Sequence, residues 1–311
     1  MESWTRKLGK TSLPVTAIGL GLAALGRPGY LNLGHGEDLG EERSVEALER
    51  RTHEVLDFAY DAGVRYFDAA RSYGRAEQFL GSWLERRGFA PGELTVGSKW
   101  GYTYTANWQV DADPPEVKDL SPDNFRRQLA ETRELLGAHL SLYQIHSATL
   151  SSGVLDDAEL RDELAGLRST GVAIGLTVTG AEQAATIEHA LEVGGFDTVQ
   201  ATWNLIERSA GDALGRAHEA GLGVIVKEAL ANGRLTARGG ERAPGDAFAL
   251  AAVLAQPFVD VVLSGASTVE QLRSNLSARE LEWTPEHAAE FDGLAEEPDR
   301  YWQTRSSLAW T

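Results

Sequence analysis

The sequence predicts a (β/α)8 TIM barrel, because short runs rich in β-branched residues alternate with segments of helical periodicity. The chain of 311 residues has the length of one such barrel. Polar residues close several of the runs, at the end of the strands where barrels of this class carry their chemistry. The eight runs end near Leu20, Asp68, Lys99, His146, Thr177, Thr202, Lys227 and Ser264.

The segments between the runs have the pattern of helices. Between residues 45 and 59 apolar residues recur at ~3.6-residue spacing, which is typical of a helix lying on a barrel wall. A glycine stands just before four of the runs, where the end of a helix favours a left-handed residue. These glycines are Gly63, Gly171, Gly195 and Gly221.

Three of the predicted helices have recognisable start signals. One is a serine followed by a proline at the first helical position, and two are capping boxes. The residues are Ser121 with Pro122, Thr179 with Glu182, and Ser267 with Glu270. No linker-like segment divides the chain, so we expect residues 1–311 to form a single domain.

Two loops are longer than is usual for this fold. Residues 25–42, which are rich in glycine, follow the first run, and residues 101–120 follow the third. Both are expected at the mouth of the barrel, where long loops usually serve function. Aromatic residues at the start of the second loop are predicted to line a substrate pocket, unless they only fold that loop onto the rim. They are Trp100, Tyr102, Tyr104 and Trp108.

Composition limits the partners that the chain can have. The formal net charge is −17 and no run of Lys or Arg occurs, so we expect a small molecule as partner and no nucleic acid or membrane surface. The first ten residues lack the apolar core of a signal peptide, and no apolar stretch has spanning length, so we expect a cytoplasmic protein. The absence of cysteine excludes disulfides and thiolate chemistry, and no metal site is predicted.

Residues 19–24, GLGLAA, match the looser form of the Rossmann dinucleotide fingerprint. A Rossmann unit needs a helix to begin at once on those glycines, whereas LGRPGY and more glycines follow here and stop a helix. We therefore interpret Gly19 and Gly21 as allowing the first strand to pass close to whatever fills the barrel mouth.

Four polar residues form the candidate centre of chemistry. Asp68, Lys99 and His146 close or nearly close predicted strands, and Tyr73 follows Asp68 by five residues. Together these groups can protonate a carbonyl while hydride is delivered. Taken singly, Asp68 and Lys99 fit a structural ion pair, Tyr73 a loop tyrosine and His146 a core histidine. His139 precedes its strand, which puts it at the opposite end of the barrel.

Over nearly its whole length the chain resembles the aldo-keto reductase superfamily. The matching segments are RKLGKTSLPVTAIGLG, FDAARSYGRAEQFLG, VGSKWG, LYQIH, VQATWNLIER and LSGASTVEQLRSNLSA. The resemblance implies a barrel with an N-terminal β-hairpin at about residues 5–16. It also implies a nicotinamide dinucleotide bound in extended form, and an oxidoreductase that interconverts a carbonyl (aldehyde, ketone or sugar) and an alcohol.

The resemblance assigns a role to each of the four polar residues. Tyr73 is the proton donor in reduction and the acceptor in oxidation, and His146 orients the substrate carbonyl. A free tyrosine has a pKa near 10, so its phenolate needs support at neutral pH. Lys99 is expected to supply that support, with Asp68 holding the ammonium in place.

The resemblance also assigns the cofactor residues. Gln200 and Thr177 match positions that hold the nicotinamide carboxamide, while Val178 stands where the family usually has asparagine. Other matching positions hold the adenosine phosphate and adenine, and they are Gly265, Ser267, Gln271 and Asn275. The resemblance favours NADP(H) as the cofactor. Members selective for NADP often carry Lys or Arg where this chain has glycine and glutamine, so NAD(H) remains possible.

Lys227 is the sharpest departure from the family pattern, because it replaces the aromatic residue that stacks on the nicotinamide. Lys227 either pairs with Glu228 or another carboxylate, or contacts cofactor or substrate, and Trp203 is a candidate for the lost aromatic surface. Two tryptophans near the C-terminus either close over the pocket or pack as a tail, and these are Trp302 and Trp310.

The expected activity has one main alternative. Some relatives, such as potassium-channel β subunits, act chiefly by binding a partner, so a nucleotide-binding regulatory subunit is the second hypothesis. A non-redox barrel enzyme, such as an isomerase, would have no use for all four polar residues.

Overall fold

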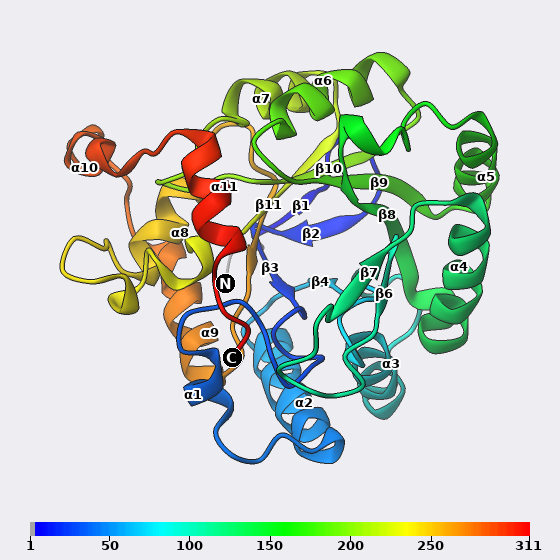
Figure 1. Cartoon of the computed structure of the whole chain (residues 1–311), viewed down its shortest axis with the longest axis horizontal. Helices are drawn as coiled ribbons and strands as arrows, with labels where there is room; N and C mark the ends of the chain where they lie inside the picture. The colour runs from blue at the N-terminus through cyan, green and yellow to red at the C-terminus, as the bar shows by residue number, and fades with distance from the viewer. Residues whose placement is uncertain (1–3) are drawn as a thin grey trace.

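The computed structural model of the chain describes residues 4–311. Eight parallel strands close into a barrel in chain order, and helices surround them (Figure 1). The predicted (β/α)8 fold is confirmed, and every predicted run ends within two residues of a strand end. The barrel strands are β3 (Ile18–Gly21), β4 (Tyr66–Asp68), β5 (Thr95–Trp100), β8 (Leu140–Ala148), β9 (Ala173–Val178), β10 (Thr198–Thr202), β11 (Gly223–Lys227) and β12 (Val261–Ser264).

Helices follow the strands and cover the outside of the barrel. Those of the main ring are α2 (Val45–Asp61), α3 (Ala76–Arg87), α4 (Pro122–Leu136), α5 (Ala158–Ser169), α6 (Gln183–Val193), α7 (Gly211–Glu219), α8 (Asp246–Leu254) and α9 (Val269–Leu276). Three further helices are α1 (His35–Leu39), α10 (Pro285–Glu290) and α11 (Pro298–Ser306).

A short hairpin closes the amino-terminal end of the barrel, as the resemblance implies. Its strands, β1 (Thr5–Lys7) and β2 (Pro14–Thr16), pair in antiparallel fashion. Leu8 and Val15 from the hairpin are fully buried and pack with Tyr66 inside the barrel. This end is therefore apolar and closed, which leaves the carboxyl ends of the strands as the open end.

Local signals fix several helix ends. The Ser121 hydroxyl accepts a hydrogen bond from the backbone N–H of Asn124 at 3.3 Å, which confirms the predicted start of α4. The four glycines before strands have φ between +88° and +97°, the left-handed region that glycine enters without strain. They therefore end the preceding helices as predicted.

The two predicted capping boxes are wrong. A turn through Gly180, with φ of +86°, delays α6, which begins after Glu182 without a side-chain cap. In α9 the cap is Thr268, whose hydroxyl accepts from the N–H of Gln271 at 3.2 Å. The Ser267 hydroxyl instead contacts the Gln271 side chain, so the start of the helix lies one residue later than predicted.

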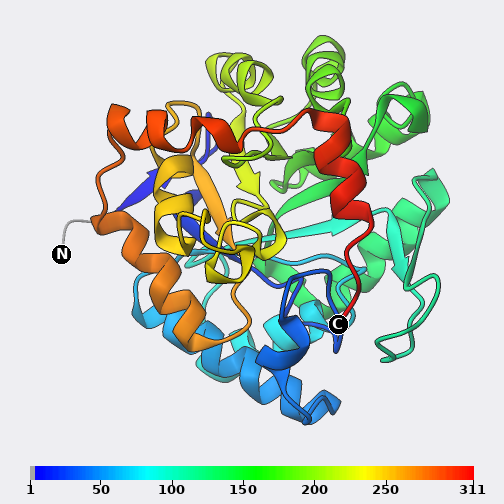
Figure 2. The ribbon, with the colours of Figure 1, turned by 60° about the vertical axis from the view of Figure 1, so that its left-hand side comes forward.

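Both long loops stand at the open end of the barrel and carry structure of their own. The first contains α1, and the second contains a hairpin of β6 (Tyr102–Tyr104) and β7 (Glu116–Lys118). The C-terminal segment after α11 runs beside the first loop (Figure 2). There Tyr30 and Thr311 exchange two backbone hydrogen bonds, of 3.3 and 3.2 Å. The tail thus helps to shape the rim.

Alternation along the strands sorts the barrel residues into two sets. In β4, Tyr66 and Asp68 face the interior, while Phe67 packs outward with its ring centroid 5.2 Å from that of Trp83 in α3. The apolar core between strands and helices is built from such outward residues. Because the outward residues form that core, inward residues near the open end can be polar, as Asp68 and Lys99 are.

Candidate active site

A buried ion pair forms the centre of the site. The ammonium of Lys99 in β5 donates to the carboxylate of Asp68 at the end of β4, and to the carbonyl of Ala69 at 3.0 Å. Only 1% of each of the two charged residues is exposed. Because β4 and β5 are neighbours in the barrel, their inward residues meet at this point.

Asp68 is held by further donors from inside the barrel. Its Oδ1 accepts from the Tyr66 hydroxyl at 2.9 Å, from the Gln144 amide at 3.1 Å and from the Gln200 amide at 3.5 Å. A buried carboxylate needs such partners to offset its lost hydration. The position of Asp68, and through it that of Lys99, is therefore fixed from several strands.

Tyr73 lies against this pair on the loop after β4. Its ring centroid is 4.9 Å from Nζ of Lys99. Gly26 holds the loop, since its carbonyl accepts from the N–H of Arg75 at 2.7 Å. A Cβ on Gly26 would lie 2.1 Å from the carbonyl oxygen of Tyr73, so the two loops approach closely only because residue 26 is glycine.

His146 of β8 completes the group of four. Its ring lies at 86° to that of Tyr73, with centroids 5.5 Å apart, and Nδ1 is 3.5 Å from the Ser72 hydroxyl. The structure therefore brings Asp68, Lys99, Tyr73 and His146 together, as the sequence predicts.

Burial decides the protonation of the two ring side chains. Burial, and then the charge of Asp68, raise the pKa of Tyr73 above its ordinary value, and Arg27 opposes them. The phenol is protonated at neutral pH, as it would be at its ordinary pKa near 10. Burial and the positive charge of Lys99 lower the pKa of His146 well below 6.5, so its imidazole is neutral.

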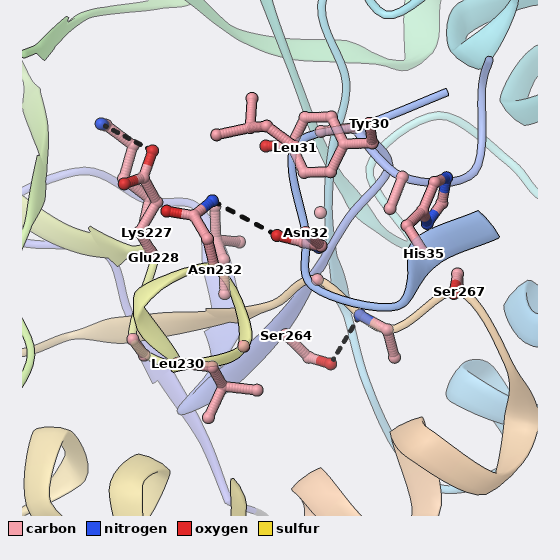
Figure 3. Close-up of a pocket in the computed structure, with 18 of the residues that line it drawn as sticks. Tyr30, Leu31, Asn32, His35, Lys227, Glu228, Leu230, Asn232, Ser264 and Ser267 are labelled. Carbon is pink, nitrogen blue, oxygen red and sulfur yellow. Dashed lines mark hydrogen bonds and ion pairs between the residues drawn. The ribbon is translucent and has the colours of Figure 1, made fainter. Parts of the chain in front are cut away.

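A cavity of about 590 Å³ opens at the carboxyl ends of the strands. It extends between the first loop and the loop after β11, where the Asn232 amide donates to the side chain of Asn32 at 3.3 Å (Figure 3). Most residues that the sequence singles out line this one cavity. They are Asp68, Tyr73, Tyr102, His146, Thr177, Gln200, Lys227, Gly265, Ser267, Gln271 and Asn275.

Three of the four aromatic residues predicted for the substrate pocket lie elsewhere, and only Tyr102 lines the cavity. Trp100 is fully buried between the barrel and α4, with its ring centroid 5.1 Å from that of Phe125. It follows the inward Lys99, so strand alternation turns it outward. Trp108 donates to the carbonyl of Arg43 at 2.7 Å and lines a separate hollow with Tyr104. Trp108 and Tyr104 therefore hold the second loop on the rim, whereas Trp100 belongs to the apolar core.

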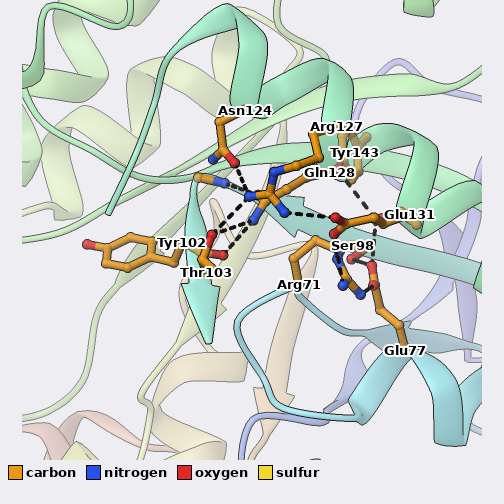
Figure 4. A network of polar contacts seen from close by, with 12 residues as sticks. Arg71, Glu77, Ser98, Tyr102, Thr103, Asn124, Arg127, Gln128, Glu131 and Tyr143 are labelled. Atoms are coloured by element: carbon orange, nitrogen blue, oxygen red, sulfur yellow. Dashed lines mark hydrogen bonds and ion pairs between the residues drawn. The ribbon is translucent and has the colours of Figure 1, made fainter. Parts of the chain in front are cut away.

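A polar network supports the loop of Tyr73 and the β6–β7 hairpin together (Figure 4). Arg71, two residues before Tyr73, pairs with the buried Glu77 and with Glu131 of α4. Arg127 pairs with the same Glu131 at 2.7 Å and donates to the Thr103 hydroxyl of β6 at 3.0 Å. The hairpin that carries Tyr102 is thereby tied to the wall that carries Tyr73.

The end of the cavity beside Tyr73 and His146 offers a hydrogen-bond donor and a hydrogen-bond acceptor to an amide group of a ligand. The Thr177 hydroxyl oxygen accepts from the N–H of Ser147 at 2.7 Å, which leaves its own proton to donate. Gln200 lines the same wall and carries both an amide N–H and a carbonyl oxygen. Val178, the residue that replaces an asparagine of the family, faces the apolar core instead.

The other end of the cavity is built around Gln271 of α9. Its carbonyl oxygen accepts from the N–H and the hydroxyl of Ser267, at 2.9 and 3.2 Å. Its amide donates to Asp38 of α1 at 2.7 Å, and Arg238 pairs with the same carboxylate. Burial raises the pKa of Asp38, but the hydrogen bonds from Arg238 and Gln271 outweigh it, so the pKa lies below the usual range.

Asp38 and Arg238 are residues that sequence reasoning missed. They are 200 positions apart and meet only because the loops after β3 and β11 lie side by side. The length of the first loop was the available signal, since long barrel loops usually serve function. Nothing in the spacing of these residues predicts their contact.

Lys227 pairs with Glu228, the first of the two alternatives that the sequence left open, and it also lines the cavity. Its ammonium lies 3.8 Å from Glu228, donates to the Thr202 hydroxyl at 3.0 Å, and lines the cavity. Burial lowers the pKa of Lys227 to about 8, although Glu228 opposes the shift. Trp203 does not replace the lost aromatic, because it packs against Phe258 behind the wall.

The residues present suit an extended dinucleotide. Amide partners line one end of the cavity, and hydroxyl and amide groups stand at the first turn of α9 at the other, where free backbone N–H groups favour an anion. Gly265 has no atom within 4 Å of where a Cβ would lie, so this wall leaves space for a ligand.

Among residues 4–311, no helix is both long and apolar enough to cross a membrane.

Comparison with known proteins gives consistent matches. The model of the Aldo/keto reductase family matches residues 17–249. Pyridoxal 4-dehydrogenase of Microbacterium luteolum is 26% identical over 81% of this chain and 78% of its own. The NADH-specific methylglyoxal reductase of Escherichia coli is 25% identical over 94% of this chain and 98% of its own. A crystal structure of a putative aldo-keto reductase from Pseudomonas aeruginosa has a TM-score of 0.67 and 26% identity, covering 89% of this chain and 94% of that one.

Mild acid should destabilise the fold through two buried histidines. Burial lowers the pKa of His35 to about 4 and that of His146 well below 6.5. Below pH 6.5 the unfolded chain binds protons at these residues that the folded chain does not, so stability falls as pH falls. His35 should contribute about 1.4 kcal/mol of the loss between pH 7.5 and 5.5, and His146 should contribute in the same direction.

Denaturant unfolding at both pH values measures this loss. His35→Asn and His146→Asn should each lose less stability on acidification than the wild type. His139→Asn, at the opposite end of the barrel, is the matched control for the loss of a histidine. An equal pH dependence in all four proteins would contradict the assignment of neutral, buried imidazoles.

Proposed function

The chain belongs to the aldo/keto reductase family, and we propose that it is an NAD(P)H-dependent oxidoreductase that interconverts a carbonyl compound and an alcohol. One observation carries the proposal. A protonated tyrosine, a neutral histidine and a buried lysine–aspartate pair meet at one end of a cavity whose other residues suit an extended dinucleotide. The substrate class that this chemistry serves comprises aldehydes, ketones and sugars.

Tyr73 is the proposed general acid. The bound nicotinamide would supply hydride to the carbonyl carbon, while the Tyr73 hydroxyl gives its proton to the carbonyl oxygen. The phenol is protonated at neutral pH, which is the form that reduction needs, and its raised pKa means that the phenolate left after proton transfer needs stabilisation. The resting protein is thereby set for reduction, and alcohol oxidation requires the phenolate.

The neighbours of Tyr73 support the proton transfer. As the proton leaves, negative charge develops on the phenol oxygen, and the ammonium of Lys99 near the ring stabilises it. Asp68 holds that ammonium in place. Neutral His146 offers an N–H to the carbonyl oxygen, where charge also develops, and a donor fixed in advance costs no reorganisation during the reaction.

Replacement of Tyr73 by phenylalanine tests this mechanism. The variant should fold and bind cofactor like the wild type, but its turnover should fall at least ~100-fold, the low end of general acid catalysis. NADH or NADPH oxidation with a panel of aldehydes measures turnover, and Tyr104→Phe, outside the cavity, is the matched control. Activity of Tyr73→Phe within a few-fold of the wild type would remove Tyr73 from the mechanism. Tight cofactor binding without turnover in the wild type would favour the regulatory-subunit alternative.

For the cofactor, we propose a preference for NAD(H), although the sequence favours NADP(H). Asp38 brings a negative charge to the end of the cavity where the resemblance puts the adenosine phosphate. Arg238, the cation beside it, is already paired with Asp38. A 2′-phosphate would meet this carboxylate, whereas a ribose 2′-hydroxyl can donate to it, as in other dinucleotide sites. The name of one relative, an NADH-specific reductase, is in line with this proposal.

Neutralising Asp38 should shift the preference towards NADP(H). Removing the charge ends the repulsion and frees Arg238, so Asp38→Asn should bind NADPH at least ~10-fold more tightly than the wild type. Its affinity for NADH should change less. Fluorescence titrations with both cofactors measure this, and Glu37→Gln, an exposed neighbour on α1, is the control. A wild type that binds NADPH more tightly than NADH would overturn the proposal.

A further inference from the structure

Arg27 of the first loop is buried at the cavity wall with unused hydrogen-bonding capacity. Only 2% of the residue is exposed, and it lines the cavity with Tyr73. Both hydrogen bonds that it donates to described residues leave from Nη1, to the carbonyl of Ser72 at 3.1 Å and to Glu116 at 3.0 Å. Its Nε is buried and has no partner within residues 4–311. The edge formed by Nε and Nη2 therefore has no hydrogen-bond partner among these residues.

Aromatic rings hold the guanidinium beside the reacting groups. Its central carbon lies 4.5 Å from the ring centroid of Trp310, 5.0 Å from that of Tyr30 and 5.3 Å from that of Tyr73. These rings fix the orientation of Arg27 and keep water from its faces. A buried guanidinium keeps its charge, and burying its donors without partners costs free energy. The unpaired Nε–Nη2 edge is therefore suited to an anion.

The charges around Arg27 leave this end of the cavity with an excess of cations. Besides the Asp68–Lys99 pair, its wall carries three cations, Arg27, Lys227 and Arg305, against two carboxylates, Glu116 and Glu228. Arg305 is already engaged by Glu228, at 2.6 to 3.0 Å. The excess stands out because the whole chain has a formal net charge of −17.

We propose that Arg27 binds an anionic group of the substrate, and that the substrates are therefore carbonyl compounds or alcohols that carry a carboxylate or a phosphate. This inference rests on the proposed function. The Nε–Nη2 edge of a guanidinium matches two oxygens of either anion in a bidentate contact. Because Arg27 lies against the ring of Tyr73, the anion would anchor the substrate with its carbonyl near the phenol hydroxyl.

A purely structural role for Arg27 makes a different prediction. The contacts of Nη1 tie the first loop to Ser72 and to the β7 strand, and losing them would loosen the loop for every substrate equally. Anion binding uses the other edge and affects charged substrates only. The ratio of activities on a charged substrate and on its uncharged counterpart separates the two.

The experiment compares matched pairs of aldehydes. The carboxylate pair is 4-formylbenzoate and 4-formylbenzamide, and the phosphate pair is glyceraldehyde 3-phosphate and glyceraldehyde. In the wild type, kcat/KM should be at least ~10-fold higher for the charged member of one pair, and the pair that shows it identifies the anion. In Arg27→Gln that ratio should fall to about one. Arg43→Gln is the control, because Arg43 braces the same loop through the carbonyl of Pro28 and should leave the ratio unchanged.

Calorimetric binding of the same four compounds to the wild type and Arg27→Gln gives a readout that does not need turnover. The charged member of one pair should bind at least ~10-fold more tightly to the wild type, and this advantage should vanish in the variant. Equal affinities within both pairs, or a ratio that survives Arg27→Gln, would overturn the assignment. If the uncharged aldehydes are still reduced with the help of Tyr73, only the substrate class has failed. If no aldehyde is reduced, the proposed function has failed, and the binding ratios still decide whether Arg27 selects anions.

Discussion

The ion pair between Asp68 and Lys99 is the contact on which the rest of the site depends. Two charges with 1% exposure are stable inside a barrel only if the surrounding groups satisfy them, and here the barrel interior does so through Tyr66 and two amides. These donors come from three different strands, so the buried pair is satisfied only when the barrel is closed. Tyr73 and His146 are placed against this fixed centre, and the cavity extends outward from it.

Much of this arrangement follows from the sequence, because it depends on strand periodicity and on which end of a strand a residue closes. The strand ends, the hairpin and the meeting of Asp68, Lys99 and His146 are of this kind. Strand alternation would also have excluded Trp100 from the pocket, since it follows an inward lysine. The capping boxes failed because the turns before α6 and α9 are set by backbone geometry that residue types alone do not fix.

The charges that tune the site were not predictable in this way. Asp38 meets Arg238 and Gln271, and Arg27 meets Glu116, through contacts between loops that are far apart in the sequence. Only the three-dimensional closure of the barrel brings them to one cavity. That closure also gives the cavity two different ends, with an acidic group near Gln271 and an excess of cations near Tyr73. Cofactor choice and substrate choice are thereby controlled by separate residues.

Deuterium transfer tests the central claim most directly. The protein is incubated in ordinary water with NADH in which both hydrogens at C4 of the nicotinamide are replaced by deuterium, and with 4-formylbenzoate or 4-formylbenzamide, and the alcohol is analysed by mass spectrometry. Hydride transfer within the cavity predicts an alcohol that carries one deuterium, bound to carbon, for each cofactor oxidised. An alcohol without deuterium, or cofactor oxidation without any alcohol, would contradict the account.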